Sequence, residues 1–415
     1  MPMMLRFGLT AVLALVSMSR AMAAPGLEGV PAYGHIVVIE MENRQYGQII
    51  DADPPTSPGM TELAHQFGVA TNYYGISHVS QPNYIAFVSG DQQGITDDDP
   101  WYCDASHAPM PRDRAIVAGK PDAASMSTTC EGHGSASAPY TAHHFSTRSL
   151  FAQLNDAGIS WSMFNQTMPL DPDGTPHPEV AIYPDKKQNP DFHALYVSKH
   201  NPADNFDNIR SAPDFLTHNR TEQQFLDEAA AGTLPRFSYF IPDLCHDDHG
   251  ASGPMNTALQ CRHHGAGPSP LLTLGDQKVQ QLVEAVRHSP LWNSAENVAV
   301  VVTFDEDDYG SAGIQGCCGY HPVAEGGARF DTLNQGGGHI PTIVITNHGA
   351  ARMQDATPYN HYSLLRTVED AFGIAEHLGH AADIRPVQPA DGSFVQTPVL
   401  PMVKLFSVQP SRASR

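Results

Sequence analysis

The sequence predicts an α/β fold, a three-layer sandwich in which helices cover both faces of a mostly parallel central sheet. Four short apolar runs lack the polar alternation of half-exposed strands, and such runs are typical of strands buried on both faces. Helical patterns lie between these runs, and alternating strands and helices indicate a layered α/β fold. The four runs are residues 35–39, 236–241, 297–304 and 340–346.

Three segments have the features of helices. Residues 276–288 place aliphatic side chains at i, i+3, i+4 and i+7 behind Asp276, the expected N-cap, and residues 361–374 repeat this pattern. In the stretch SHVSQPNYIAFVSGD, Ser80 stands at an N-cap position and Pro82 fits the first helical turn. A helix N-terminus with a hydroxyl can receive a phosphate, although an ordinary capped helix has the same pattern.

The first 23 residues have the pattern of a secretory signal peptide. Arg6 supplies a positive start, the apolar stretch that follows is too short to span a bilayer, and Ala21-Met22-Ala23 is a small-x-small cleavage pattern. We expect cleavage after Ala23 and a secreted or periplasmic protein. No later stretch approaches the ~20 apolar residues of a membrane span, so no stable membrane association is expected.

The chain is acidic and has the composition of a globular enzyme. It has 44 Asp and Glu residues against 23 Lys and Arg residues, so we expect no nucleic-acid partner. The low share of charged residues, 16%, together with 34 Gly and 34 Pro, indicates long structured loops. The expected organisation is a catalytic domain over 24–380, with insertions or a cap at 92–145 and about 165–220, and a C-terminal tail at 381–415.

Six cysteines in an exported chain favour disulfides. Proximity in the sequence favours a bridge that would pin the first insertion and a second bridge near residue 250. The two adjacent cysteines either form a vicinal bridge or stay reduced. In that order, the pairs are Cys103 with Cys130, Cys245 with Cys261, and Cys317 with Cys318.

Carboxylates follow three of the expected strands. Ligands of open α/β sheets gather outside the carboxyl ends of the strands, and buried carboxylates that repel one another are stabilised by a cation. Oxygen ligands suit Mg²⁺, Ca²⁺ or Mn²⁺, and nearby histidines would also admit Zn²⁺ or Fe, so the metal identity stays open. Taken singly, each cluster also fits a solvated loop. The residues are Glu42 with Asn43, Asp243 with Asp247, and Asp305 with Glu306.

A metal bound by these carboxylates would explain the serine at the start of the helix expected in SHVSQPNYIAFVSGD. It would lower the pKa of the Ser80 hydroxyl, while the helix N-terminus and the Asn83 amide hold phosphoryl oxygens. The expected course is a phosphoserine intermediate followed by attack of water. The expected metal ligands are Glu42, Asn43, Ser80, Asp305 and Glu306.

Blocks between Tyr33 and Ile374 resemble, in order, those of the phosphoesterase family. That family contains secreted acid phosphatases and bacterial phospholipases C and belongs to the alkaline-phosphatase-like superfamily, so the resemblance implies that fold. It also implies that Ser80 is the nucleophile and that the Glu-Asn and Asp-Glu pairs hold the metal. The blocks are HIVVIEMENRQYGQII, SHVSQPNYIAFVSGD, LFAQLNDAGISWSMF, PDLCHDDHG, VVTFDEDD and YNHYSLLRTVEDAFGI.

The resemblance is looser for the histidines. In PDLCHDDHG, Asp247 and His249 match the family spacing best, with His249 either protonating the leaving oxygen or contacting the metal or phosphate. Asp243 and His246 are second choices. His339 resembles a late metal-binding histidine of the superfamily, which would imply a second metal. Two further positions are either close to the site or structural, namely His78 and His361.

The resemblance implies an exported, metal-dependent acid phosphatase that hydrolyses small phosphate monoesters. A phospholipase C or a phosphoinositide phosphatase would use the same arrangement and remains the alternative. Little chain follows Ile374, whereas lipid-cleaving members often carry further β-rich domains, which favours small substrates. A non-catalytic metal-binding protein would need neither Ser80 nor Asn83. A sulfatase is disfavoured because no Arg follows Pro82 at the sulfatase spacing.

Overall fold

The computed structural model describes residues 25–95, 115–117, 120–122, 143, 145–178, 195–251, 261–262, 269–308, 316–318, 336–384 and 398–409. The predicted signal peptide and the predicted Cys103–Cys130 bridge lie outside the described residues, as does most of the insertion at 92–145. Within the described part of the chain, no helix is both long and apolar enough to cross a membrane.

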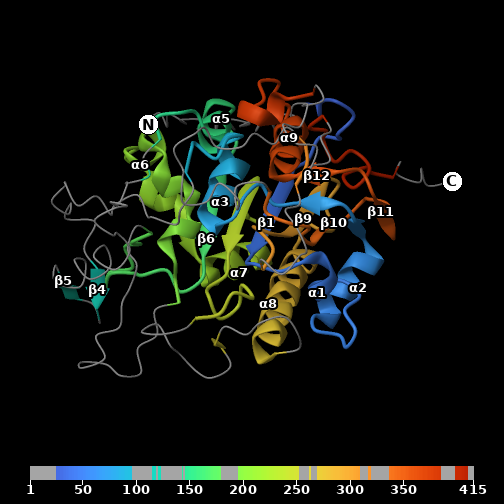
Figure 1. Ribbon diagram of the computed structural model, residues 1–415. Helices are drawn as coiled ribbons and strands as arrows, with labels where there is room; N and C mark the ends of the chain where they lie inside the picture. The colour runs from blue at the N-terminus through green and yellow to red at the C-terminus, as the bar shows by residue number, and fades with distance from the viewer. Residues whose placement is uncertain are drawn as a thin grey trace, which may run out of the picture.

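An eight-stranded sheet forms the centre of the molecule, with the strand order β11-β2-β10-β9-β1-β8-β6-β7 (Figure 1). Strand β1 lies between β8 and β9 and is parallel to both. The strands are β1 (His35–Met41), β2 (Gly68–Ala70), β6 (Trp161–Asn165), β7 (Asn219–Thr221), β8 (Phe237–Ile241), β9 (Val298–Phe304), β10 (Thr342–Thr346) and β11 (Met353–Asp355).

The mostly parallel sheet confirms the predicted fold class, with one difference in strand direction. Strand β10, the fourth predicted run, is antiparallel to both of its neighbours, β9 and β2. Every residue of β10 is buried, as the continuous apolar run indicates. Burial on both faces produces such a run in either direction, so the sequence pattern does not carry the direction of the strand.

Helices cover the sheet in two groups. Helix α3 contacts both α5 and α9 along one side, whereas α8 contacts both α2 and α7 in the other group, as Figure 1 shows. The α-helices are α1 (Tyr46–Ile49), α2 (Pro58–Gln66), α3 (Ser80–Ser89), α5 (Leu150–Asp156), α6 (Asp207–Arg210), α7 (Glu222–Ala231), α8 (Pro270–Arg287) and α9 (His361–Ala371).

Shorter elements complete the described structure. Two small sheets pair β3 with β12 and β4 with β5. Three short 3₁₀ turns lie within the described part of the predicted cap at 165–220. The bounds are β3 (Tyr73–Tyr74), β4 (Ala115–Val117), β5 (Lys120–Asp122) and β12 (Tyr359–Asn360) for the strands, and η2 (Ser198–His200), η3 (Pro202–Asn205), η4 (Phe215–His218) and η7 (Gly379–Ala382) for the 3₁₀ turns.

The C-terminal segment 398–409 belongs to the core. Val399, Met402 and Phe406 are fully buried in the main apolar cluster. The Tyr33 hydroxyl donates a hydrogen bond of 2.8 Å to the carbonyl oxygen of Phe406. This segment shows no periodicity in the sequence because it packs as an irregular turn, which has no repeating face.

Helix α8 begins earlier than the sequence predicts. Its N-cap is Ser269, so the predicted Asp276 cap is wrong and Asp276 lies within the helix. The Asp276 carboxylate instead accepts the backbone N–H groups of Gly59 and Met60, at 3.0 and 2.7 Å, in the first turn of α2. Those N–H groups have no partner inside their own helix, so a side chain from another helix can satisfy them.

Two disulfides lie within the described residues. The predicted bridge between Cys245 and Cys261 is present, and Cys317 and Cys318 form the vicinal bridge rather than two thiols. The side-chain amide of Asn360 donates to the carbonyl oxygens of both Cys317 and Cys318, at 2.7 Å each. The same Asn360 side chain caps the N-terminus of α9.

Candidate active site

Four of the five predicted metal ligands follow the carboxyl ends of two neighbouring strands. Met41, the last residue of β1, is level with Phe304, the last residue of β9. The backbone N–H of Asp305 donates to the Met41 carbonyl oxygen at 3.0 Å, which extends the pairing by one residue. Glu42 and Asn43 therefore emerge beside Asp305 and Glu306, as expected for parallel strands.

Ser80 lies between two of these carboxylates. Its Oγ is 3.0 Å from Glu42 Oε2 and 3.3 Å from Glu306 Oε1, and the residue is only 3% exposed. The N-cap of α3 is Val79 and not Ser80, which corrects the predicted cap by one residue. The shift has a physical reason, because the Ser80 hydroxyl hydrogen-bonds to carboxylates and not to helix N–H groups.

Asn43 joins the two strand ends. It adopts the left-handed conformation with φ 43°, which asparagine tolerates better than most residues. Its backbone N–H donates to Asp305 Oδ1 at 3.0 Å, and its side-chain amide donates to Glu306 Oε1 at 3.1 Å. Asn43 Oδ1 and Asp305 Oδ2 are buried and accept no hydrogen bond. Two such oxygens beside two further carboxylates form a donor set that fits a hard divalent cation.

The electrostatics of this region also favour a cation. Burial raises the pKa values of Asp305 and Asp247 well above the usual range, and the neighbouring charge of Glu42 adds to both shifts. Burial raises the pKa of Glu40 to about 8, against the hydrogen bond from Tyr239. Several buried carboxylates that repel one another are costly without a positive partner.

The metal-free protein is therefore expected to lose stability as the pH rises from 5 to 8. A carboxyl with a raised folded pKa binds more protons in the native state, so the free energy of unfolding falls between the unfolded and folded pKa values. For Glu40 this window runs from 4.5 to about 8. Each such group contributes up to about 1.4 kcal/mol per pH unit. Urea unfolding with chelator at both pH values measures this change, and stability that is equal or higher at pH 8 would contradict it.

His200 is a site residue that the sequence analysis missed. It ends the turn η2, is buried, and places Nε2 at 3.2 Å from Glu42 Oε1. Its ring stacks on Tyr84 with the centroids 4.8 Å apart, and the Tyr84 hydroxyl donates to Glu42 Oε1 at 2.5 Å. Burial lowers the pKa of His200 well below its usual value, with the charges of Lys199 and His249 adding to the shift, so the ring is neutral. The only signal in the sequence was its place in the predicted cap.

Two of the histidines for which the family resemblance is looser, His78 and His249, also lie near the predicted ligands. His78 Nδ1 is bonded to Glu306, and its Nε2 lies 3.4 Å from Asp307 Oδ1. His249 donates its backbone N–H to Asp247 Oδ1 at 2.8 Å. The His249 ring donates from Nδ1 to the Gly250 carbonyl oxygen at 2.7 Å. Asp247 in turn accepts the backbone N–H of Glu42 with its carbonyl oxygen, at 2.7 Å.

Asn83 differs from the prediction that its amide holds phosphoryl oxygens. Its Oδ1 accepts the backbone N–H groups of Ile76 and Ser77, at 2.8 and 3.1 Å. Its Nδ2 donates to the carbonyl oxygens of Ser77 and Val79, at 2.8 and 3.0 Å. These bonds use the full capacity of the amide. In this structure Asn83 positions the loop that leads into Ser80.

The remaining candidates have other partners. His361 donates from Nε2 to the Asp305 carbonyl oxygen at 2.7 Å, and burial lowers its pKa to about 4, so it supports the strand end as a neutral ring. His339 stacks on Tyr46 with the centroids 4.8 Å apart, and its Nε2 donates to the Thr71 carbonyl oxygen at 3.1 Å, which does not support a second metal there. The carboxylate of Asp243 pairs with Nδ1 of His246 at 2.7 Å.

The sequence matches a known family and several curated proteins. The model of the phosphoesterase family matches residues 51–375. An acid phosphatase of Aspergillus fumigatus is 22% identical over 84% of this chain and 56% of its own length. A probable acid phosphatase of Kluyveromyces lactis is 22% identical over 84% of this chain and 60% of its own length. The chain thus spans little more than half of these two relatives.

A third relative matches this chain over almost the full length of both proteins. It is a phosphatidylinositol-3-phosphatase of Mycobacterium tuberculosis, which is 22% identical over 92% of this chain and 91% of its own length. Among solved structures, a protein in the alkaline phosphatase superfamily from Vibrio parahaemolyticus has a TM-score of 0.45 with 10% identity, covering 89% of this chain and 74% of that one.

Proposed function

The chain belongs to the phosphoesterase family, and we propose that it is an exported, metal-dependent phosphomonoesterase of the acid-phosphatase type. One observation carries this proposal. The Ser80 hydroxyl lies within hydrogen-bonding distance of Glu42 and Glu306, at the N-terminus of a buried helix. A hydroxyl held among carboxylates beside a helix N-terminus suits a nucleophile that attacks phosphorus.

The proposed metal ligands are Glu42, Asn43, Ser80, Asp305 and Glu306. Glu42 and Glu306 contact the Ser80 hydroxyl, and Asn43 is hydrogen-bonded to Asp305 and Glu306. When bound, a divalent metal would lower the pKa of that hydroxyl and offset the negative charge of the phosphoryl oxygens. The Tyr84 hydroxyl donates to Glu42 Oε1 at 2.5 Å, and His200 Nε2 lies 3.2 Å from the same oxygen. The bond from Tyr84 orients Glu42 so that its second oxygen, Oε2, accepts the hydrogen bond from Ser80.

In the proposed reaction Ser80 Oγ forms a bond to phosphorus while the bond from phosphorus to the alcohol oxygen breaks. The backbone N–H groups at the start of α3 would donate hydrogen bonds to the phosphoryl oxygens. We assign His249 as the donor of the proton to the leaving oxygen, since Asp247 fixes its backbone beside the site. Water then attacks the phosphoserine, which releases phosphate and restores the hydroxyl.

Two features support export. The N-terminal 23 residues have the signal-peptide pattern. The pairs Cys245–Cys261 and Cys317–Cys318 are both oxidised, and structural disulfides persist mainly in oxidising compartments.

The test of the proposed function is hydrolysis of p-nitrophenyl phosphate and p-nitrophenyl phosphorylcholine between about pH 4 and 9. Phosphatase turnover is expected to disappear after chelation and to return when one of Mg²⁺, Ca²⁺, Mn²⁺, Zn²⁺ or Fe²⁺ is added. Faster cleavage of the choline ester would indicate a phospholipase C. Turnover that survives complete removal of metal would contradict the metal-dependent mechanism.

A phosphoinositide phosphatase is the second candidate, because the mycobacterial relative matches this chain along almost its full length. Both candidates share the same proposed nucleophile and metal ligands. Phosphate release from phosphatidylinositol 3-phosphate in mixed micelles, compared with release from a soluble monoester, separates them. A higher kcat/KM for the lipid would assign the second function.

A further inference from the structure

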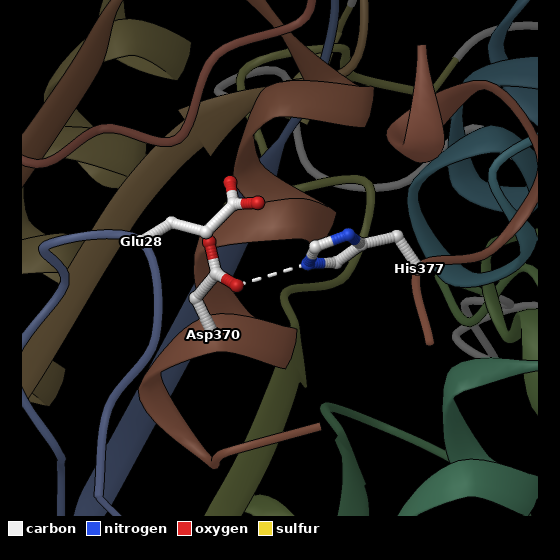
Figure 2. Close-up of side chains that lie close together, drawn as sticks. All are labelled: Glu28, Asp370 and His377. Atoms are coloured by element: carbon white, nitrogen blue, oxygen red, sulfur yellow. Dashed lines mark hydrogen bonds and ion pairs between the residues drawn. The ribbon is translucent and has the colours of Figure 1, made fainter. Parts of the chain in front are cut away.

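A second group of potential metal ligands lies at the opposite end of α9 from the active site. Glu28, Asp370 and His377 each offer one ligand atom, and these atoms all lie within 4.8 Å of one another. Figure 2 shows that the three side chains converge from the N-terminal segment, from α9 and from the loop after α9. The axial distance from His361 to Asp370 is about 14 Å along the helix, so the two sites are separate.

Asp370 is the residue that points to a bound cation. Its side chain is completely buried, and its Oδ1 is paired with His377 Nε2 at 2.9 Å. Its Oδ2 is buried as well but has no hydrogen-bond partner. In Figure 2 the Asp370 carboxylate reaches toward both Glu28 and His377. A buried carboxylate oxygen without a donor is costly, and a cation between these side chains would remove that cost.

The position of Asp370 near the C-terminal end of α9 makes a bound cation more favourable still. It lies in the last turn of α9, next to Glu369, and that turn contains no basic residue. The C-terminal end of a helix carries partial negative charge, so carboxylates there are unfavourable. Arg366 is the nearby cation, but two of its nitrogens bind Glu28 at 2.7 and 2.8 Å and a third binds the Ala381 carbonyl oxygen.

We propose that Glu28, Asp370 and His377 bind a structural Zn²⁺-class divalent cation, which joins the N-terminal segment to the end of α9. One imidazole nitrogen with two carboxylate oxygens is a donor set that suits Zn²⁺, whereas Ca²⁺ prefers oxygen ligands alone. Glu28 keeps 41% of its side chain exposed, so solvent can fill the remaining coordination position and the ion has a path of entry.

The ion would strengthen contacts that the backbone already makes. The N–H of Leu27 donates to the Asp370 carbonyl oxygen at 3.0 Å, and the N–H of Tyr33 donates to the Ala371 carbonyl oxygen at 3.1 Å. These bonds hold the segment before β1 against the end of α9. A metal that binds only the folded arrangement stabilises it further.

The alternative is that the hydrogen bond from His377 to Asp370 forms without any metal, and a measurement of metal binding distinguishes the two arrangements. The full-length mature protein is stripped with chelator and dialysed against Zn²⁺, and the bound metal is measured by mass spectrometry. The wild type is expected to bind one equivalent more than His377→Gln and Asp370→Asn. His288→Gln is the matched control, because His288 is 79% exposed and remote from the three ligands in the sequence.

Two further readouts do not depend on enzymatic activity. Zn²⁺ is expected to raise the Tm of the wild type more than that of His377→Gln, and Co²⁺ is expected to give a d–d absorption band that His377→Gln lacks. Turnover of p-nitrophenyl phosphate should stay within about twofold of wild type in His377→Gln. Equal Zn²⁺ binding by wild type and both variants, or a preference of this site for Ca²⁺, would overturn the proposal.

Discussion

Ser80→Ala is expected to reduce turnover of p-nitrophenyl phosphate by at least about a thousand-fold, because removal of a nucleophile has effects of this size or larger. The hydroxyl donates to Glu42 Oε2 at 3.0 Å, and the residue lies in the first turn of α3. Alanine keeps the helix and removes the atom that would attack phosphorus. The fold is expected to remain unchanged, with the same circular dichroism spectrum.

The matched control is Ser89→Ala in the same helix. Ser89 is buried like Ser80, but its hydroxyl donates to the carbonyl oxygen of Ile85 at 2.9 Å, at the end of α3 away from the carboxylates. Its loss should leave kcat within about twofold while costing a similar hydrogen bond. Full activity in Ser80→Ala would remove the serine from the mechanism. Equal losses in the two variants would show a structural role only.

Asp305→Asn is expected to have opposite effects on stability and on metal binding. Burial and the charges of Glu42 and Glu306 raise the pKa of Asp305 well above its usual range. Asparagine keeps an oxygen that can accept the Asn43 N–H and removes the repelling charge. The metal-free variant should therefore be more stable at pH 8, by on the order of 1–2 kcal/mol. Its affinity for the divalent metal should fall about a hundred-fold or more, and turnover with it.

Urea unfolding with chelator and with saturating metal measures both effects in one experiment. The wild type should gain more stability from the metal than Asp305→Asn does. Asp156→Asn serves as the control, because the side chain of Asp156 is 69% exposed and pairs with Arg148 on the surface. A variant that is less stable than wild type without metal would show that Asp305 is held by favourable contacts and not by a cation.

The sequence predicted four of the eight strands of the central sheet, β1, β8, β9 and β10, and the carboxylates that follow β1 and β9, because that information is local. A continuous apolar run shows burial on both faces, and the polar residues that follow it lie at the end of the strand. The same reasoning could not give the direction of β10, since an antiparallel strand in the middle of a sheet is equally apolar. Asp276 had the residue type and position of a cap, but it caps a different helix.

The sequence by itself determined the layered α/β class and the position of carboxylates after the ends of β1 and β9, because periodicity and residue type act over a few neighbouring positions. The tertiary structure decided which distant side chains join that chemistry. His200 reaches Glu42 from a turn without regular pattern, and Asn83 binds the backbone and not the open site. Glu28 and His377 meet at Asp370 only because the chain folds back on α9. Such contacts depend on packing between remote segments, and packing leaves no local pattern in the sequence.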